Sequence, residues 1–176
     1  QPGKLNFGST GSGGSPHLIS ELFRLETGID VVHIPFKGDA PLQPALISNQ
    51  VQYAFLTPIA LMSHVKAGRV RALAVTGTRR ASIAPEVPTM AEAGYPGAEY
   101  VGWIGIFAPA GTPRDIQVRI SGETQRALKA PDIVKRLPGW GGDAAGTTPE
   151  EFTKRFHSDI DTFRRIVKEA GISLKN

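Results

Sequence analysis

Glycines and hydroxyl-bearing residues gather in one short stretch near the start of the chain, GSTGSGGS at residues 8–15. The glycines let the backbone turn tightly and come close to a guest molecule. Ser15 is a good helix N-cap and Pro16 suits the first helical turn, so a helix starting here would direct its free amides and positive dipole end at the turn. Helix starts of this kind bind small anions such as a carboxylate or a phosphate. The same residues also fit a plain glycine-rich connection.

We predict a small-anion site at this turn. Its candidate residues are Ser9, Thr10, Gly11, Ser12, Gly13, Gly14 and Ser15, with His17 in the first turn of the following helix. His17 could donate a hydrogen bond to a bound anion, although an isolated surface histidine is the more ordinary interpretation of that position.

Two further junctions between a strand-like segment and a helix resemble the first. Asp39 and Thr57 each precede a helix that carries proline in its first turn. The carboxyl ends of parallel strands share one edge of a sheet, where ligands of open α/β sheets bind. With Lys37 beside Asp39, a negative guest is favoured there over a cation. Lys37, Gly38, Thr57 and Pro58 therefore join the predicted site, although Ser, Thr and Asp are favoured caps of any helix.

The sequence contains no complete motif for catalysis, cofactor binding or metal binding. A serine nucleophile elbow needs Gly-x-Ser-x-Gly, but Ser12 has Thr10 two places before it. A dinucleotide fingerprint starting at Gly11 would need glycine where Pro16 stands. The four histidines lack metal-ligand spacing, and the chain has no cysteine. We predict no catalytic residue, no metal and no cofactor, with a serine enzyme using Ser12 or Ser15 as the less favoured alternative.

Alternating apolar patterns predict an α/β fold with a mostly parallel sheet. Strands are predicted near Leu5 and Phe7 and at residues 31–34, 51–56 and 70–75, with helices after Ser15, Asp39 and Thr57. Gly28 and Gly68 are placed to end the first and third of these helices. The sheet should carry helices on both faces, and residues 31–34 and 51–56 should lie in the same sheet.

The second part of the chain has fewer strand signals and more helical ones. Residues 77–99 are predicted to be an irregular segment apart from a short helix at 89–93. The further predicted elements are a strand at 100–107, a helix from Thr112 with Asp115 in a capping box, a short helix at 132–137, and a long helix with a capping box at Thr148 and an apolar stripe that includes Phe152, Phe156 and Phe163. With few strands to cover, these helices should bury their apolar faces elsewhere, such as on a second copy of the chain.

Composition limits the class of protein. The chain has 176 residues, is 40% hydrophobic and 20% charged, and carries a formal net charge of +4. These values fit one domain, or one and a fraction, and are too mildly basic to argue for a nucleic-acid partner. No apolar run is long enough to span a bilayer. The chain opens Gln1-Pro2-Gly3 without a signal-like segment, and the lack of cysteine fits a periplasmic or secreted protein without excluding others.

The order of several short motifs resembles one protein family. The motifs are GSTGSGGSPHLISELF, HIPFKGDAPLQPALISNQVQYAFL, HVKAGRVRALAVTGTRR, EVPTMAEAG, GWIGIFAPAGTP and TPEEF. Over almost the whole chain they are similar to the periplasmic solute-binding proteins of tripartite tricarboxylate transporters, the Bug family. The resemblance implies a two-lobed, type II periplasmic-binding-protein fold that closes on a small carboxylate and has no catalytic function. It also implies that residues 9–17, the Lys37-Gly38 turn and the Thr57-Pro58 junction face the ligand cleft.

The resemblance further implies a division of the chain and a set of partners. Residues 1–101 would form the α/β ligand-binding lobe, the second lobe of the family fold, and residues 102–176 the C-terminal part of an incomplete first lobe. The ligand would be a di- or tricarboxylate, an amino acid or an aromatic acid, delivered in the periplasm to the membrane permease of the transporter. Family members carry a long segment before Lys4 that builds one cleft wall. The alternative is therefore a truncated chain without independent ligand binding that self-associates through its incomplete lobe.

Overall fold

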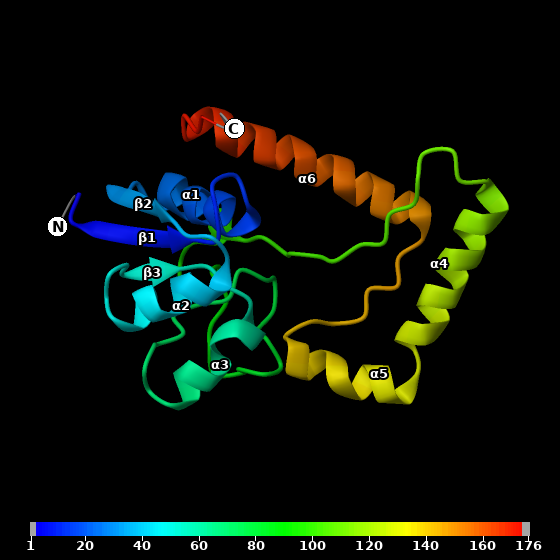
Figure 1. The fold of residues 1–176 in the computed structure, drawn as a ribbon, viewed down its shortest axis with the longest axis horizontal. Coiled ribbons are helices and arrows are strands. Elements are labelled where there is room, and N and C mark those ends of the chain that lie inside the picture. Colours follow the sequence, from blue (N-terminus) through cyan, green and yellow to red (C-terminus); the bar gives the residue numbers. More distant parts are fainter. Residues whose placement is uncertain (1–2, 174–176) are drawn as a thin grey trace.

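The computed structural model describes residues 3–173 and centres on a three-stranded parallel sheet (Figure 1). β1 (Leu5–Ser9) lies between β2 (Val31–Pro35) and the short β3 (Tyr53–Ala54). The helices are α1 (Ser15–Thr27), α2 (Asp39–Ile47), α3 (Pro58–Lys66), α4 (Arg114–Leu128), α5 (Pro131–Arg136) and α6 (Pro149–Glu169), with 3-10 turns η1 (Pro96–Ala98) and η2 (Leu137–Trp140). Because β2 and β3 both pair with β1 in parallel, the predicted α/β class and the shared sheet are confirmed.

Helices cover both faces of this sheet because the side chains of β1 alternate between the faces. Phe7 lies on the face of α1, where its ring stacks with that of His17 at 6.1 Å between centroids. Gly8 lies on the opposite face, where a Cβ would meet Leu42 of α2 and Val51. Leu42 and Val51 are fully buried. The absence of a side chain at Gly8 therefore lets α2 pack closely on the central strand.

Two of the predicted helix caps are wrong by one residue. The N-caps of α1 and α2 are Gly14 and Gly38, so Ser15 and Asp39 are the first helical residues and their side chains do not cap. At Gly38 the backbone has φ 92°, which glycine adopts without steric cost, so the turn itself selects glycine there. Thr57 does occupy the N-cap of α3, in an extended conformation.

Of the two predicted capping boxes, one forms and the other does not. At α6 the Thr148 hydroxyl accepts from the Glu151 amide and the Glu151 carboxylate accepts from the Thr148 amide, which confirms that box. At α4 the N-cap is Pro113, which has no side-chain oxygen, so the predicted box with Asp115 does not form.

The predicted strand at residues 70–75 is wrong. Only Val75 forms a β-bridge there, with Thr89, and Leu73 is 67% exposed. A strand exists only where a neighbour accepts and donates its backbone hydrogen bonds, and the two residues of β3 offer too short an edge. The predicted short helix at 89–93 is also wrong, because that segment is a turn closed by reciprocal hydrogen bonds between Thr89 and Glu92.

The predicted strand at residues 100–107 is wrong for the same reason. This segment is extended, but within residues 3–173 it pairs with no strand. The segment follows η1 in the chain, leaves the sheet-containing part of the molecule and reaches α4 after passing near the start of α6 (Figure 1). Ile104 is 103% exposed and Ile106 is 65% exposed. The apolar pattern that predicted a strand is therefore left without a covering layer.

α6 connects the second part of the chain to the sheet. Ile166 is fully buried and packs with Leu18 of α1. Nearer its start, α6 presents Phe152 and Phe156 to Trp103 of the extended segment, with ring centroids 4.9 and 6.1 Å apart. Both phenylalanines are only partly buried. The predicted apolar stripe thus packs on two partners and is not enclosed by either.

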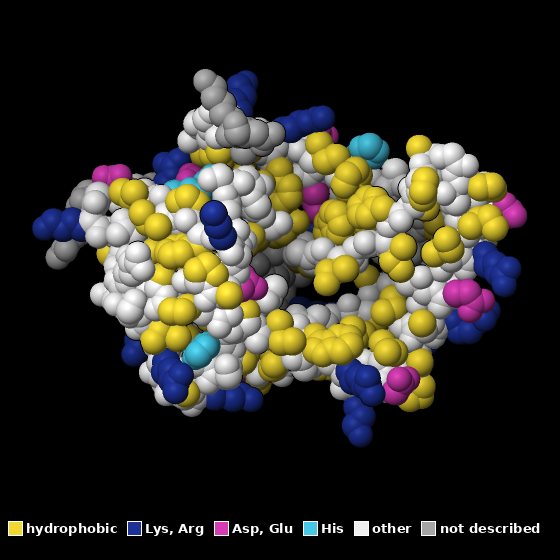
Figure 2. All heavy atoms as spheres, viewed as in Figure 1, with side chains coloured by type: hydrophobic (Ala, Val, Ile, Leu, Met, Phe, Trp, Pro, Cys, Tyr) yellow, Lys and Arg dark blue, Asp and Glu magenta, His cyan; other side chains and the backbone are white. Residues whose placement is uncertain are grey.

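α4 and α5 contain no buried residue. Exposed apolar side chains follow the extended segment and these two helices, namely Ile104, Ile106, Phe107, Ile116, Val118, Ile120 and Val134. We call this set the apolar frame. Figure 2 shows hydrophobic side chains gathered around an opening on this side of the molecule. The apolar faces of these helices are therefore not covered by the described part of the chain.

Candidate functional site

The glycine-rich turn, residues 9–15, lies at the carboxyl edge of the sheet between the turns that follow β2 and β3. Its central place follows from the strand order, in which β1 is the middle strand. The Phe36 amide donates to the Ser9 carbonyl at 2.8 Å, and the Gly38 amide donates to the Thr10 carbonyl at 3.2 Å. The structure therefore joins two of the predicted groups of site residues, the glycine-rich turn and the Lys37-Gly38 turn.

The shape of the glycine-rich turn depends on two glycines and one buried serine. Gly11 has φ 143° and Gly13 has φ 77°, conformations that side chains disfavour. The hydroxyl of Ser9 is fully buried and bonds both the amide of Gly11 at 3.3 Å and its carbonyl at 3.1 Å. Ser9 thus fixes the turn from inside the protein.

The turn leaves several backbone amides available to a guest. Within residues 3–173, the hydrogen bonds of this segment leave the amides of Ser12, Gly14 and Ser15 without a protein acceptor. Ser12 and Ser15 are exposed, and Gly14 is the N-cap of α1, where the helix dipole is positive. The arrangement can donate hydrogen bonds to one small anion.

His17 is a buried residue, so its interpretation as a surface histidine is wrong. It is 4% exposed, and its Nδ1 accepts a hydrogen bond from the Gly13 amide at 3.0 Å. Its Nε2 lies 3.7 Å from the Glu21 carboxylate. Burial lowers the pKa of His17, and the nearby Glu21 carboxylate opposes that effect only in part. A neutral His17 therefore holds the glycine-rich turn from behind.

His33 belongs to the same cluster and was not among the predicted residues. Its ring stacks on that of His17 with centroids 3.8 Å apart and planes 11° from parallel. Its Nε2 is hydrogen-bonded to Ser9 Oγ at 2.6 Å. Burial, and secondly the neighbouring His17, lower the pKa of His33 to about 4. Both imidazoles are therefore neutral at pH 7, and they support the turn in that form.

Lys37, Thr57 and Pro58 are the remaining predicted site residues, and they are less closely tied to the glycine-rich turn. Lys37 is exposed, as is Thr57. The segment after η2 passes close to Pro58, since a Cβ added at Gly141 would lie 2.9 Å from the Pro58 ring. Within residues 3–173 the Thr57-Pro58 junction shares the sheet edge with the glycine-rich turn but makes no hydrogen bond to it.

Residues 3–173 contain neither an exposed serine paired with a base nor a metal-binding cluster. Within residues 3–173, Ser12 and Ser15 make no hydrogen bond to a histidine, and Ser9, which does, is fully buried. A nucleophilic serine needs a base within hydrogen-bond reach and an exposed oxygen. The described residues contain no group of three His, Cys, Asp or Glu side chains placed to hold a metal. No helix in residues 3–173 has the length and apolar character needed to cross a membrane.

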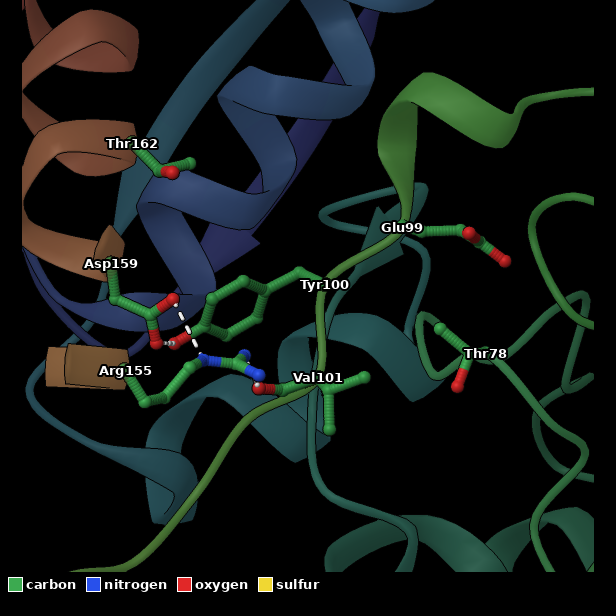
Figure 3. A pocket seen from close by; sticks show the side chains of 7 residues that line it. All are labelled: Thr78, Glu99, Tyr100, Val101, Arg155, Asp159 and Thr162. Atoms are coloured by element: carbon green, nitrogen blue, oxygen red, sulfur yellow. Dashed lines mark hydrogen bonds and ion pairs between the residues drawn. The ribbon is translucent and has the colours of Figure 1, made fainter. Parts of the chain in front are cut away.

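A separate pocket of about 190 Å³ shares no residue with the glycine-rich turn. It lies between the start of the extended segment and α6 (Figure 3), and its lining residues are Thr78, Glu99, Tyr100, Val101, Arg155, Asp159 and Thr162. Asp159 already accepts from Arg155 Nε at 3.0 Å. Since Arg155 is engaged and the other charged groups are acidic, this pocket is poorly suited to an anion.

Comparison with known proteins identifies a transport-receptor family. The family model for the tripartite tricarboxylate transporter family receptor, TctC, matches residues 1–172. A Pseudomonas protein described as the UPF0065 protein in the tcbD-tcbE intergenic region is 38% identical over 169 residues, which are 96% of this chain and 50% of that protein. Protein BugT of Bordetella pertussis is 32% identical over 175 residues, 99% of this chain and 54% of that protein.

Solved structures have the same fold. R. palustris Rpa4515 with adipate superposes with a TM-score of 0.87 at 31% identity, over 98% of this chain and 58% of that one. A structure of a periplasmic transporter gives 0.87 at 36% identity, over 99% and 58%. MatC from Rhodopseudomonas palustris with bound malate gives 0.78 at 28% identity, over 94% and 57%. The chain spans about half the length of the two curated relatives named above.

Proposed function

Because the chain belongs to the family of tripartite tricarboxylate transporter receptors, we propose that its glycine-rich turn binds one carboxylate group of a small solute. The observation that carries this proposal is the set of amides of Ser12, Gly14 and Ser15 at the positive end of α1, which find no acceptor among residues 3–173. A hydrogen bond to a charged oxygen contributes ~1.5–3 kcal/mol, so two or three fix a carboxylate without an arginine. The adipate and malate of the two solved relatives favour a dicarboxylate.

In this proposal the predicted site residues divide into two roles. The hydroxyls of Thr10, Ser12 and Ser15 and the neighbouring amides face the ligand, while Ser9 and His17 shape the turn from inside. Lys37 and Gly38, and the Thr57-Pro58 junction, contribute from the adjacent turns of the same edge. The exposed Lys37 adds a positive charge nearby and thereby favours an anion over a cation.

The proposed role is transport rather than catalysis. Receptors of this family belong to tripartite tricarboxylate transporters, so the bound solute would be delivered to a membrane permease. The match to a periplasmic transporter supports a periplasmic location. Residues 1–101 would form the ligand-binding lobe, and residues 102–176 would belong to the other lobe.

Replacing Gly13 with valine is expected to lower the affinity for adipate or malate at least ~10-fold. Gly13 has φ 77°, which a β-branched residue disfavours strongly, so the turn would lose the shape that presents its amides. Isothermal titration calorimetry with both dicarboxylates measures the effect. Gly94→Val is the matched control, since Gly94 also has positive φ (95°), a Cβ there would meet nothing within 4 Å, and it lies outside the site. Equal affinity in the wild type and the Gly13 variant would contradict the proposed site.

Self-association is the second candidate property, and the apolar frame is the observation that favours it. Ile104 is 103% exposed and Phe107 is 62% exposed, which is unusual for large apolar side chains close together. If copies of the chain associate through the frame, sedimentation equilibrium should show a dimer or larger species at micromolar concentration. The double substitution Ile104→Ser and Phe107→Ser should return the chain to a monomer. A wild-type chain that is monomeric throughout would contradict this property.

A further inference from the structure

We propose that His17 holds the glycine-rich turn in its carboxylate-binding form only while its imidazole is neutral, so that acid weakens binding by protonating the stacked His17–His33 pair. The inference rests on the proposed function for its ligand, but its structural part, the link between His17 and the turn, stands on geometry alone. It makes His17 a positioning residue that regulates the site.

The first step is the hydrogen bond between Gly13 and His17. The Gly13 amide donates to His17 Nδ1 at 3.0 Å, so this nitrogen must carry a lone pair and no proton. Protonation turns Nδ1 into a donor that faces another donor. Gly13 lies between Ser12 and Gly14, whose amides have no acceptor in the described part of the chain, so loss of this bond releases the part of the turn that presents them.

The second step is the coupling of His17 to His33. The two rings stack at 3.8 Å between centroids, and His33 Nε2 is bonded to Ser9 Oγ at 2.6 Å. Ser9 in turn bonds the amide and carbonyl of Gly11. A positive charge on either imidazole therefore disfavours a positive charge on the other. A charge on His33 also acts on Ser9, the second residue that fixes the shape of the turn.

The groups around the pair decide the direction of the effect. Glu21 lies 3.7 Å from His17 Nε2 and favours its cation, but Glu21 is already paired with Arg24 at 2.6 Å. Tyr53 of β3 belongs to the same cluster as the two histidines. Burial raises the pKa of the Tyr53 hydroxyl, so Tyr53 stays neutral. Burial lowers the pKa of both histidines from 6.5, that of His33 to about 4. Both are thus neutral at pH 7 and take up protons only below pH 6.5.

The binding test compares the full chain with His17→Asn in a pH series from 7.5 down to 4.0, using adipate and malate in a calorimeter. The Asn Oδ1 stands near the position of Nδ1, accepts a hydrogen bond and does not titrate. The ligand's own protonation is common to both proteins, so the ratio of the two affinity losses isolates His17. We expect the wild type to lose at least ~5-fold more affinity than His17→Asn. His157→Asn, at an exposed position of α6, should behave like the wild type.

A second readout needs no ligand. In ¹H–¹⁵N spectra the Gly13 amide shift should move with the protonation of the His17 ring in the wild type and stay constant in His17→Asn. Absence of binding at any pH would overturn the proposed function, while the Gly13 shift would still decide this inference. Equal affinity losses in the wild type and His17→Asn, or a Gly13 amide that ignores the titration of His17, would overturn the inference itself.

Discussion

Gly8→Val is expected to lower the free energy of unfolding of the chain by about 3 kcal/mol or more. Gly8 is buried in the central strand, and a Cβ there would overlap Leu42 and lie 3.1 Å from a methyl carbon of Val51. Both neighbours are fully buried members of one hydrophobic cluster, so making room for the new side chain requires the surrounding core to repack. Overpacking of a well-packed core costs typically ~1–3 kcal/mol and occasionally more. Valine adds two further methyl groups to the clash, so the loss should reach about 3 kcal/mol or more.

Urea unfolding followed by circular dichroism measures this loss directly. Gly122→Val is the control, because Gly122 lies in α4, where a Cβ would meet nothing within 4 Å. That variant should unfold within about 0.5 kcal/mol of the wild type, as surface substitutions usually do. If Gly8→Val unfolds at the same urea concentration as the control, α2 does not pack on β1 as described.

Elements marked by local chemistry could be predicted from the sequence. Gly28 ends α1 in the left-handed conformation (φ 65°), and the capping box at Thr148 forms as its spacing indicates. Both signals involve residues within one helical turn of each other. The strands predicted at 70–75 and 100–107 do not form in the described structure, because an apolar pattern shows that a side chain suits a sheet, not that a neighbouring strand is present.

The candidate site likewise has one part that the local sequence predicts and one part that depends on distant pairing. The composition of residues 9–15 was sufficient to predict a tight turn at a helix start, and the structure places it there. The partnership of Ser9 with His33 was out of reach, since it depends on the register that sets Phe7 opposite His33 across β1 and β2. The burial of His17 follows from the same register, because its ring stacks on that of His33. Pairing between distant residues is a property of the sheet, which no local pattern encodes.

Asp159→Ala is expected to detach the extended segment from α6. The Asp159 carboxylate is 7% exposed as a residue and accepts hydrogen bonds from Trp103 Nε1, from Arg155 Nε at 3.0 Å and from Tyr100 OH at 3.5 Å. Arg155 also donates to the Val101 carbonyl at 2.7 Å, so it ties the backbone of the segment to the helix (Figure 3). Removal of the carboxylate leaves three donors without their acceptor.

The expected loss is about 2 kcal/mol, because an unsatisfied buried donor costs ~1–3 kcal/mol and the half-exposed Arg155 recovers part of its loss from water. Trp103 reports the event: in a Trp140→Phe background its fluorescence should shift to longer wavelength, and the urea midpoint should fall. Asp161→Ala is the matched control, because Asp161 lies on the same helix with its side chain 75% exposed and pairs only with the exposed Arg164 among residues 3–173. Unchanged Trp103 emission in Asp159→Ala would mean that the aromatic contacts with Phe152 and Phe156 hold the segment without the carboxylate. If the emission shifts as expected, one buried acid sets the path of the chain from the sheet to α4.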